Sequence, residues 1–152
     1  EYDQAMADYR ARRYGAAQKN FDNVANRGGG NAPTAELFAA QSVRNQAGCS
    51  AATSRFESIN SKHRGTGIGN EALWQAGDCY RTAGDPENAR RAYKQLIGVA
   101  GYDGRAQRAL ASLDEEPVAA RQEAAKPKPA AKPEPQKAAP KAGEPAPKPP
   151  AY

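Results

Sequence analysis

The chain has 152 residues, 39% of them hydrophobic, and a formal net charge of +5. Residues 117–152 hold ten of the twelve prolines, seven basic and three acidic side chains, and no Ile, Leu, Met, Phe or Trp. Residues 1–116 hold 15 basic and 14 acidic side chains, which argues against the concentrated basic face of a nucleic-acid-binding protein. No stretch approaches the ~18 apolar residues of a membrane-spanning helix. We therefore predict a folded domain over residues 1–116 and a disordered Pro/Lys/Ala-rich tail over residues 117–152.

Apolar residues in the folded part recur with helical spacing, which predicts an all-α fold without strands. The expected helices span residues 2–13, 14–24, 33–47, 49–59, 72–81, 86–96 and 104–113. Gly84 suits a left-handed helix end, Asp85 an N-cap and Pro86 the first position of the following helix. The connections at residues 28–30 and 63–69 contain several glycines, and we expect both loops to be long and mobile.

Three segments share an internal repeat, in which an alanine is followed by an aromatic residue four positions later and an aliphatic residue three positions beyond it. The three sets are Ala17/Phe21/Val24, Ala52/Phe56/Ile59 and Ala89/Tyr93/Leu96, at periods of 35 and 37 residues. These spacings place each set on one face of a helix. Periods of this length are typical of stacked helix hairpins. The alternative is a plain helical bundle in which the pattern is accidental.

The third unit resembles the tetratricopeptide repeat (TPR) at Leu73, Gly77, Tyr80, Ala89 and Tyr93. The resemblance covers about residues 1–98 and implies three helix hairpins stacked as a right-handed α-solenoid. The helix at 104–113 would cap the last hairpin. In the TPR pattern small residues let the paired helices approach closely.

The other two units match the TPR pattern less closely. At the positions of Gly77 and Tyr80, the second unit has Ala40 and Val43. The first unit has Ala5 and Asp8 there.

The two cysteines, Cys49 and Cys79, could be ordinary small core residues. In a TPR stack, however, the start of the helix at 49–59 lies beside the end of the helix at 72–81. The resemblance therefore implies a Cys49–Cys79 disulfide, which would place the chain outside the cytoplasm.

The first helix of each hairpin would face the concave side of the stack, where we expect a peptide or partner protein to bind. The predicted partner-binding residues are Tyr2, Met6, Tyr9, Leu37, Gln41, Arg44, Asn45, Trp74, Asp78 and Arg81, with Arg10 and Glu71 on the same faces. Aromatic residues and arginines are enriched at interface hot spots. Arg44 and Arg81 occupy equivalent repeat positions and could grip an acidic or C-terminal group. The alternative is that both pair with Asp78 or Glu71 on the helix surface.

No motif indicates catalysis, so we expect no enzyme, no cofactor and no metal site. His63 is the only histidine and lies between Lys62 and Arg64, as a solvated loop residue would. The glycines at 65–69 lack the preceding strand and the Lys-Ser/Thr of a phosphate-binding loop.

The tail resembles the envelope-spanning segment of TonB-type proteins, although it could also be a plain linker. The folded part is similar to TPR domains of periplasmic proteins, which often carry Cys-Tyr-Arg repeats and Pro/Lys linkers. The resemblance implies a non-enzymatic scaffold or adaptor in the bacterial cell envelope that binds a protein or peptide and not nucleic acid. Two alternatives stay open: the extracytoplasmic sensor part of a membrane-anchored anti-sigma factor, and cell-wall attachment through the cationic tail. The chain begins with Glu1 and not with Met, so we expect any membrane anchor to precede it.

Overall fold

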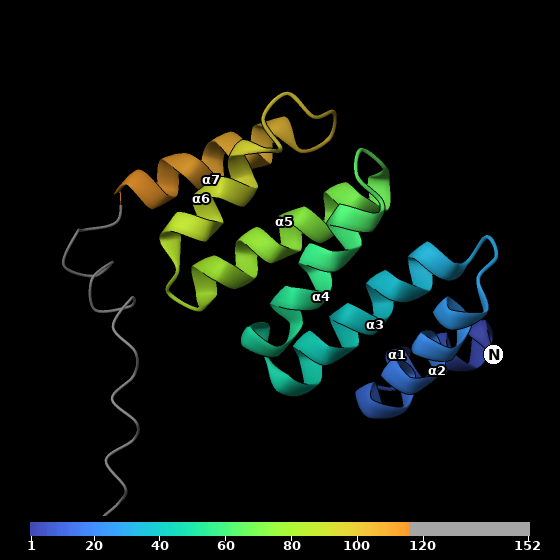
Figure 1. Cartoon of the computed structure of the whole chain (residues 1–152). Coiled ribbons are helices and arrows are strands. Elements are labelled where there is room, and N and C mark those ends of the chain that lie inside the picture. Colours follow the sequence, from blue (N-terminus) through green and yellow to red (C-terminus); the bar gives the residue numbers. More distant parts are fainter. Residues whose placement is uncertain (116–152) are drawn as a thin grey trace, which may run out of the picture.

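The computed structural model describes residues 1–115, and all regular structure within this range is helical (Figure 1). The seven helices of these residues are α1 (Tyr2–Arg10), α2 (Tyr14–Arg27), α3 (Ala32–Ala47), α4 (Cys49–Lys62), α5 (Gly67–Thr82), α6 (Pro86–Lys94) and α7 (Asp103–Glu115). The prediction of an all-α folded part is thereby confirmed. The predicted tail, 117–152, lies outside the described residues.

Each helix packs on the next one in the chain, from α1 on α2 to α6 on α7. In addition, α3 contacts α5, so two helices that are not consecutive lie side by side. Figure 1 shows the helices following one another along the molecule, with α1 and α2 at one end and α6 and α7 at the other. The chain therefore builds its core from local contacts between neighbouring helices.

The core of the described residues consists of three apolar clusters, each containing one buried aromatic residue of the repeat. Phe21 lies in the cluster of α1, α2 and α3, Phe56 in that of α3, α4 and α5, and Tyr93 in that of α5, α6 and α7. These three side chains and the alanines four residues before them are fully buried. The repeat read from the sequence thus marks the residues that are most completely removed from water.

Gly77 on α5 permits the close packing of α6. A Cβ atom built on Gly77 would lie only 2.7 Å from Cε1 of Tyr93, so a side chain there would displace the tyrosine ring. The phenol hydroxyl of Tyr93 donates a hydrogen bond at 2.6 Å to Asp78, the residue that follows Gly77 on α5. One small residue therefore fixes both the spacing of α5 and α6 and the position of Tyr93.

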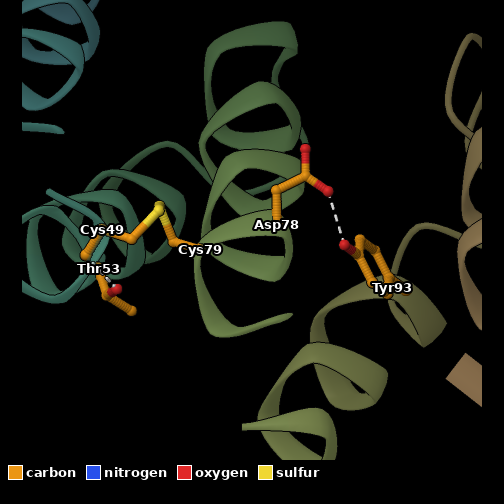
Figure 2. The surroundings of a disulfide bond; sticks show 5 residues. All are labelled: Cys49, Thr53, Asp78, Cys79 and Tyr93. Carbon is orange, nitrogen blue, oxygen red and sulfur yellow. Dashed lines mark hydrogen bonds between the residues drawn. A yellow bond between two sulfur atoms is a disulfide. The ribbon is translucent and has the colours of Figure 1, made fainter. Parts of the chain in front are cut away.

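Cys49, the first residue of α4, is paired with Cys79 near the end of α5 (Figure 2). Their Cα atoms are 4.9 Å apart, a separation that suits the predicted disulfide. The hydroxyl of Thr53 donates a hydrogen bond to the carbonyl oxygen of Cys49 at 2.7 Å. The start of α4 is thereby attached to α5 beside Asp78.

The structure differs from the sequence prediction between α4 and α5. The expected mobile loop at 63–69 is wrong in extent, because α5 already begins at Gly67. Thr66 caps this helix by accepting a hydrogen bond from the Gly69 N–H at 3.1 Å, and its hydroxyl donates to the His63 carbonyl. A Cβ on Gly69 would collide with that carbonyl at 2.1 Å. The glycine serves close backbone packing, not loop flexibility.

The first helix is also shorter than expected. It ends at Arg10 because Arg12 adopts the left-handed conformation, with φ 59°. This turn directs Arg13 back toward Asp8, whose carbonyl accepts a hydrogen bond from the Arg13 N–H at 2.8 Å. The other turn signals are confirmed: Gly84 has φ 78°, and the Asp85 carboxylate accepts from the Asn88 N–H at 3.2 Å.

Replacing Gly77 with alanine should destabilise the protein, because the new methyl group must displace the Tyr93 ring. Overpacking of this kind costs about 1–3 kcal/mol. Gly67→Ala is the matched control, since no atom outside the local helix lies within 4 Å of its Cβ position. Both substitutions raise the helix propensity, so the difference between their free energies of unfolding in urea measures the overpacking. Equal stability of the two variants would contradict the close contact.

Removing the disulfide with Cys49→Ser and Cys79→Ser should lower the free energy of unfolding. The bond closes a loop with a sequence separation of 30 residues. In the chain-entropy model such a loop contributes about 3–4 kcal/mol. The wild-type chain under reducing conditions should unfold at the same urea concentration as the double variant. Identical unfolding of oxidised and reduced wild type would show that no bond forms.

Candidate functional site

A groove of about 430 Å³ lies between α1, α3 and α5. Its lining side chains come from one face of each helix: Tyr9 from α1, Gln41, Arg44 and Asn45 from α3, and Glu71, Trp74, Gln75 and Asp78 from α5. Spacings of three and four residues along α3 and α5 align these side chains on one face. All of them except Gln75 were among the residues that the sequence placed on the concave faces.

The remaining predicted residues do not line the groove. Leu37 is buried in the cluster of α3, α4 and α5. Tyr2 and Met6 pack against the cluster around Phe21, with the Tyr2 and Phe21 ring centroids 6.0 Å apart. Arg10 is exposed at the end of α1. Helical spacing predicted which side chains share a face of each helix. It did not predict that Leu37, Tyr2 and Met6 on those faces are covered by core side chains.

Arg81 differs from its repeat equivalent, Arg44. Its Nη2 donates to the hydroxyl oxygen of Ser112 on α7 at 2.6 Å, and its charge offsets part of the rise that burial causes in the pKa of the Tyr93 phenol. Arg44 is partly exposed and has no hydrogen-bond or ion-pair partner within residues 1–115. The two arginines therefore do not share one environment. Arg44 lines the groove, whereas Arg81 is bonded to α7.

The α1 and α3 side of the groove is organised by Tyr9. Its ring packs on Phe38, with a centroid distance of 5.2 Å. Its hydroxyl donates to Gln41 Oε1 at 3.4 Å and accepts from Asn45 Nδ2 at 3.5 Å. The tyrosine thus orients two amides whose remaining polar atoms can bind a ligand.

The α5 side of the groove carries two carboxylates that are held by tyrosine hydroxyls. Glu71 accepts hydrogen bonds from Tyr102 at 2.6 Å and from Gln75 at 3.2 Å. Asp78 accepts from Tyr93 at 2.6 Å (Figure 2). Burial, together with the neighbouring carboxylate, raises the pKa of Tyr102 to about 12 and holds that of Tyr93 above its ordinary value. These neutral donors orient the carboxylates without neutralising them.

Trp74 lies between the two carboxylates along α5 and is partly buried. Its ring centroid is 5.2 Å from that of Tyr93, and the guanidinium carbon of Arg105 lies 5.5 Å from the Trp74 ring centroid. Arg105 also lies 4.6 Å from the Tyr102 ring centroid. The indole is therefore held by contacts from α6 and α7 and presents the rest of its surface to the groove.

Asp8 is a buried carboxylate whose role sequence analysis missed. It accepts hydrogen bonds from Arg13 at 2.8 Å, from Asn20 at 2.9 Å and from Gln4 at 3.2 Å. The hydrogen bond from Arg13, reinforced by those from the two amides, holds the pKa of Asp8 below its ordinary value of 3.8 against the opposing effect of burial. The sequence did contain a signal for this role, because Asp8 stands at the repeat position that Tyr80 occupies in the third unit.

Other candidates for chemistry offer little within the part of the chain that the structure describes. His63 is not a fully solvated loop residue as expected, because its Nε2 lies 3.2 Å from a carboxylate oxygen of Glu36. Lys62 binds the other oxygen of the same carboxylate at 2.8 Å. Residues 1–115 contain no group of three or more His, Cys, Asp or Glu side chains that could hold a metal ion. Among α1–α7, none is long and apolar enough to cross a bilayer.

Comparison with protein-family models, curated proteins and solved structures finds no match to this chain.

Because Asp8 has a lowered pKa in the folded state, its contribution to stability should be complete above pH ~4 and decline as the pH falls below 3.8. Asp8→Asn removes this dependence. Urea unfolding at pH 7 and at pH 3 should therefore show a stability gap between wild type and Asp8→Asn that narrows at the lower pH. A gap of the same size at both values would mean that the carboxylate charge is unimportant.

Proposed function

We propose that the folded part is a TPR-like α-solenoid that acts as a non-enzymatic scaffold and binds an extended peptide or partner segment in the groove. Three observations support the solenoid: the packing of each helix on its successor, the three repeat-centred clusters and the close contact of Gly77 with Tyr93. In this arrangement α1/α2, α3/α4 and α5/α6 are the three hairpins, and α7 caps the last one.

The observation that carries the proposed function is the origin of the groove residues. Every lining side chain comes from α1, α3 or α5, which are the first helices of the three hairpins. The second helices contribute aromatic residues to the core instead. Such a division of roles favours a binding surface on one side of the stack.

The chemistry of the groove suits a peptide. The amides of Gln41 and Asn45 can bond to backbone groups, and Arg44 can reach a carbonyl or carboxylate. Tyr9 and Trp74 offer aromatic surface for an apolar side chain, in the manner of interface anchors. The chain has a single tryptophan, so Trp74 also gives an optical signal from within the site.

The proposed location is the periplasm or another extracytoplasmic compartment of a bacterial envelope. The paired cysteines support it, since disulfides persist in oxidising compartments. The resemblance of the Lys/Pro-rich tail to TonB-type segments agrees with this location.

A peptide-display library selected on the immobilised full chain tests the proposed site. Peptides obtained in this way should bind Arg44→Ala roughly 10-fold or more weakly, since hydrogen bonds to a charged group contribute about 1.5–3 kcal/mol. Arg64→Ala is the control, because it removes the same charge from the exposed connection before α5. Calorimetry gives the affinities, and thermal unfolding verifies the fold of both variants. Equal affinity for the two variants would exclude the groove.

A further inference from the structure

The groove carries charges of both signs with an excess of negative charge. Two carboxylates, Glu71 and Asp78, line it together with one arginine, Arg44. Neither carboxylate forms an ion pair within residues 1–115. A ligand that complements the groove should therefore carry more cationic than anionic side chains.

The chain itself contains a segment of this composition. Residues 125–135 read Ala-Lys-Pro-Lys-Pro-Ala-Ala-Lys-Pro-Glu-Pro, with three lysines and one glutamate. Its four prolines favour an extended polyproline conformation, which aromatic-lined grooves recognise at a low entropic cost. Both its charges and its backbone preference match a groove that contains Tyr9 and Trp74.

The end of the described chain lies near the groove. Ser112, close to the end of α7, is bonded to Arg81, which follows Asp78 by three residues on α5. Three residues correspond to about 4.5 Å along a helix axis. The nine residues between Glu115 and the segment, 116–124, can span about 30 Å when extended. The segment can therefore reach the groove of its own chain.

We propose that, without a partner, the groove holds residues 125–135 of the same chain. This inference rests on the proposed function, because it takes the groove to be a peptide-binding site. Tethering gives the segment an effective concentration of about 1 mM or more. A weak contact with a dissociation constant of about 1 mM would therefore fill the groove about half of the time.

Paramagnetic relaxation in the full chain tests this contact. With Cys49 and Cys79 paired, a nitroxide on Ala131→Cys labels the only free thiol, and the single tryptophan gives one indole N–H signal. The nitroxide should remove more than half of the Trp74 signal, and a nitroxide on Ala151→Cys should remove less. Replacing all six tail lysines with glutamine should restore the signal. No loss of signal, equal loss from both positions, or equal loss after lysine replacement would overturn the proposal.

A synthetic peptide of residues 125–135 distinguishes this inference from the proposed function. Binding of the peptide should quench or shift the Trp74 emission. The affinity of the peptide for wild type should be about twofold lower than its affinity for the variant with all six tail lysines replaced by glutamine, because half of the wild-type grooves are already occupied. Equal binding to both chains, or binding to neither, would overturn the tail contact. The proposed function would survive either result if the selected peptides still lose affinity for Arg44→Ala.

Discussion

The contact between the Tyr93 ring and Gly77 determines how α6 lies on α5, and the groove depends on it. With the ring seated on the glycine, the Tyr93 hydroxyl orients Asp78 and the ring supports Trp74. The next residue along α5, Cys79, is bound to the start of α4 (Figure 2). Three consecutive residues thus connect α5 to the helix on either side and direct one carboxylate into the groove. The same three residues of α5 therefore determine both the packing of the neighbouring helices and the position of Asp78 in the groove.

Much of the fold could be predicted because its core follows a short-range repeat. The alanine and aromatic positions marked the buried faces, and the residues at 84–86 marked the turn before α6. The errors arose at helix ends, where particular contacts of a glycine or a side chain set the boundary. Gly69 was assigned to a loop because composition does not reveal its contact with the His63 carbonyl. The early end of α1 depends on Arg12 and on the hydrogen bonds between Arg13 and Asp8.

The groove was predictable for a related reason: helical spacing tells which side chains share a face. It does not tell what covers that face. Leu37 was assigned to the concave side but is covered by α4 and α5, and Arg81 was treated as the equivalent of Arg44 although α7 lies beside it. Gln75 was missed although it lies one helical turn after Glu71, to which it donates a hydrogen bond. Features that depend on contacts between distant helices could not be derived from spacing.

The face shared by α1, α3 and α5 is the binding surface that we propose for this protein. The most direct measurement is the mapping of amide and indole chemical shifts in the full chain during titration with a selected peptide. The largest changes should occur at the Trp74 indole and at the side-chain amides of Gln41, Asn45 and Gln75, with small changes along α2, α4 and α6. Changes centred on those second helices, with an unaffected Trp74 indole, would contradict the claim.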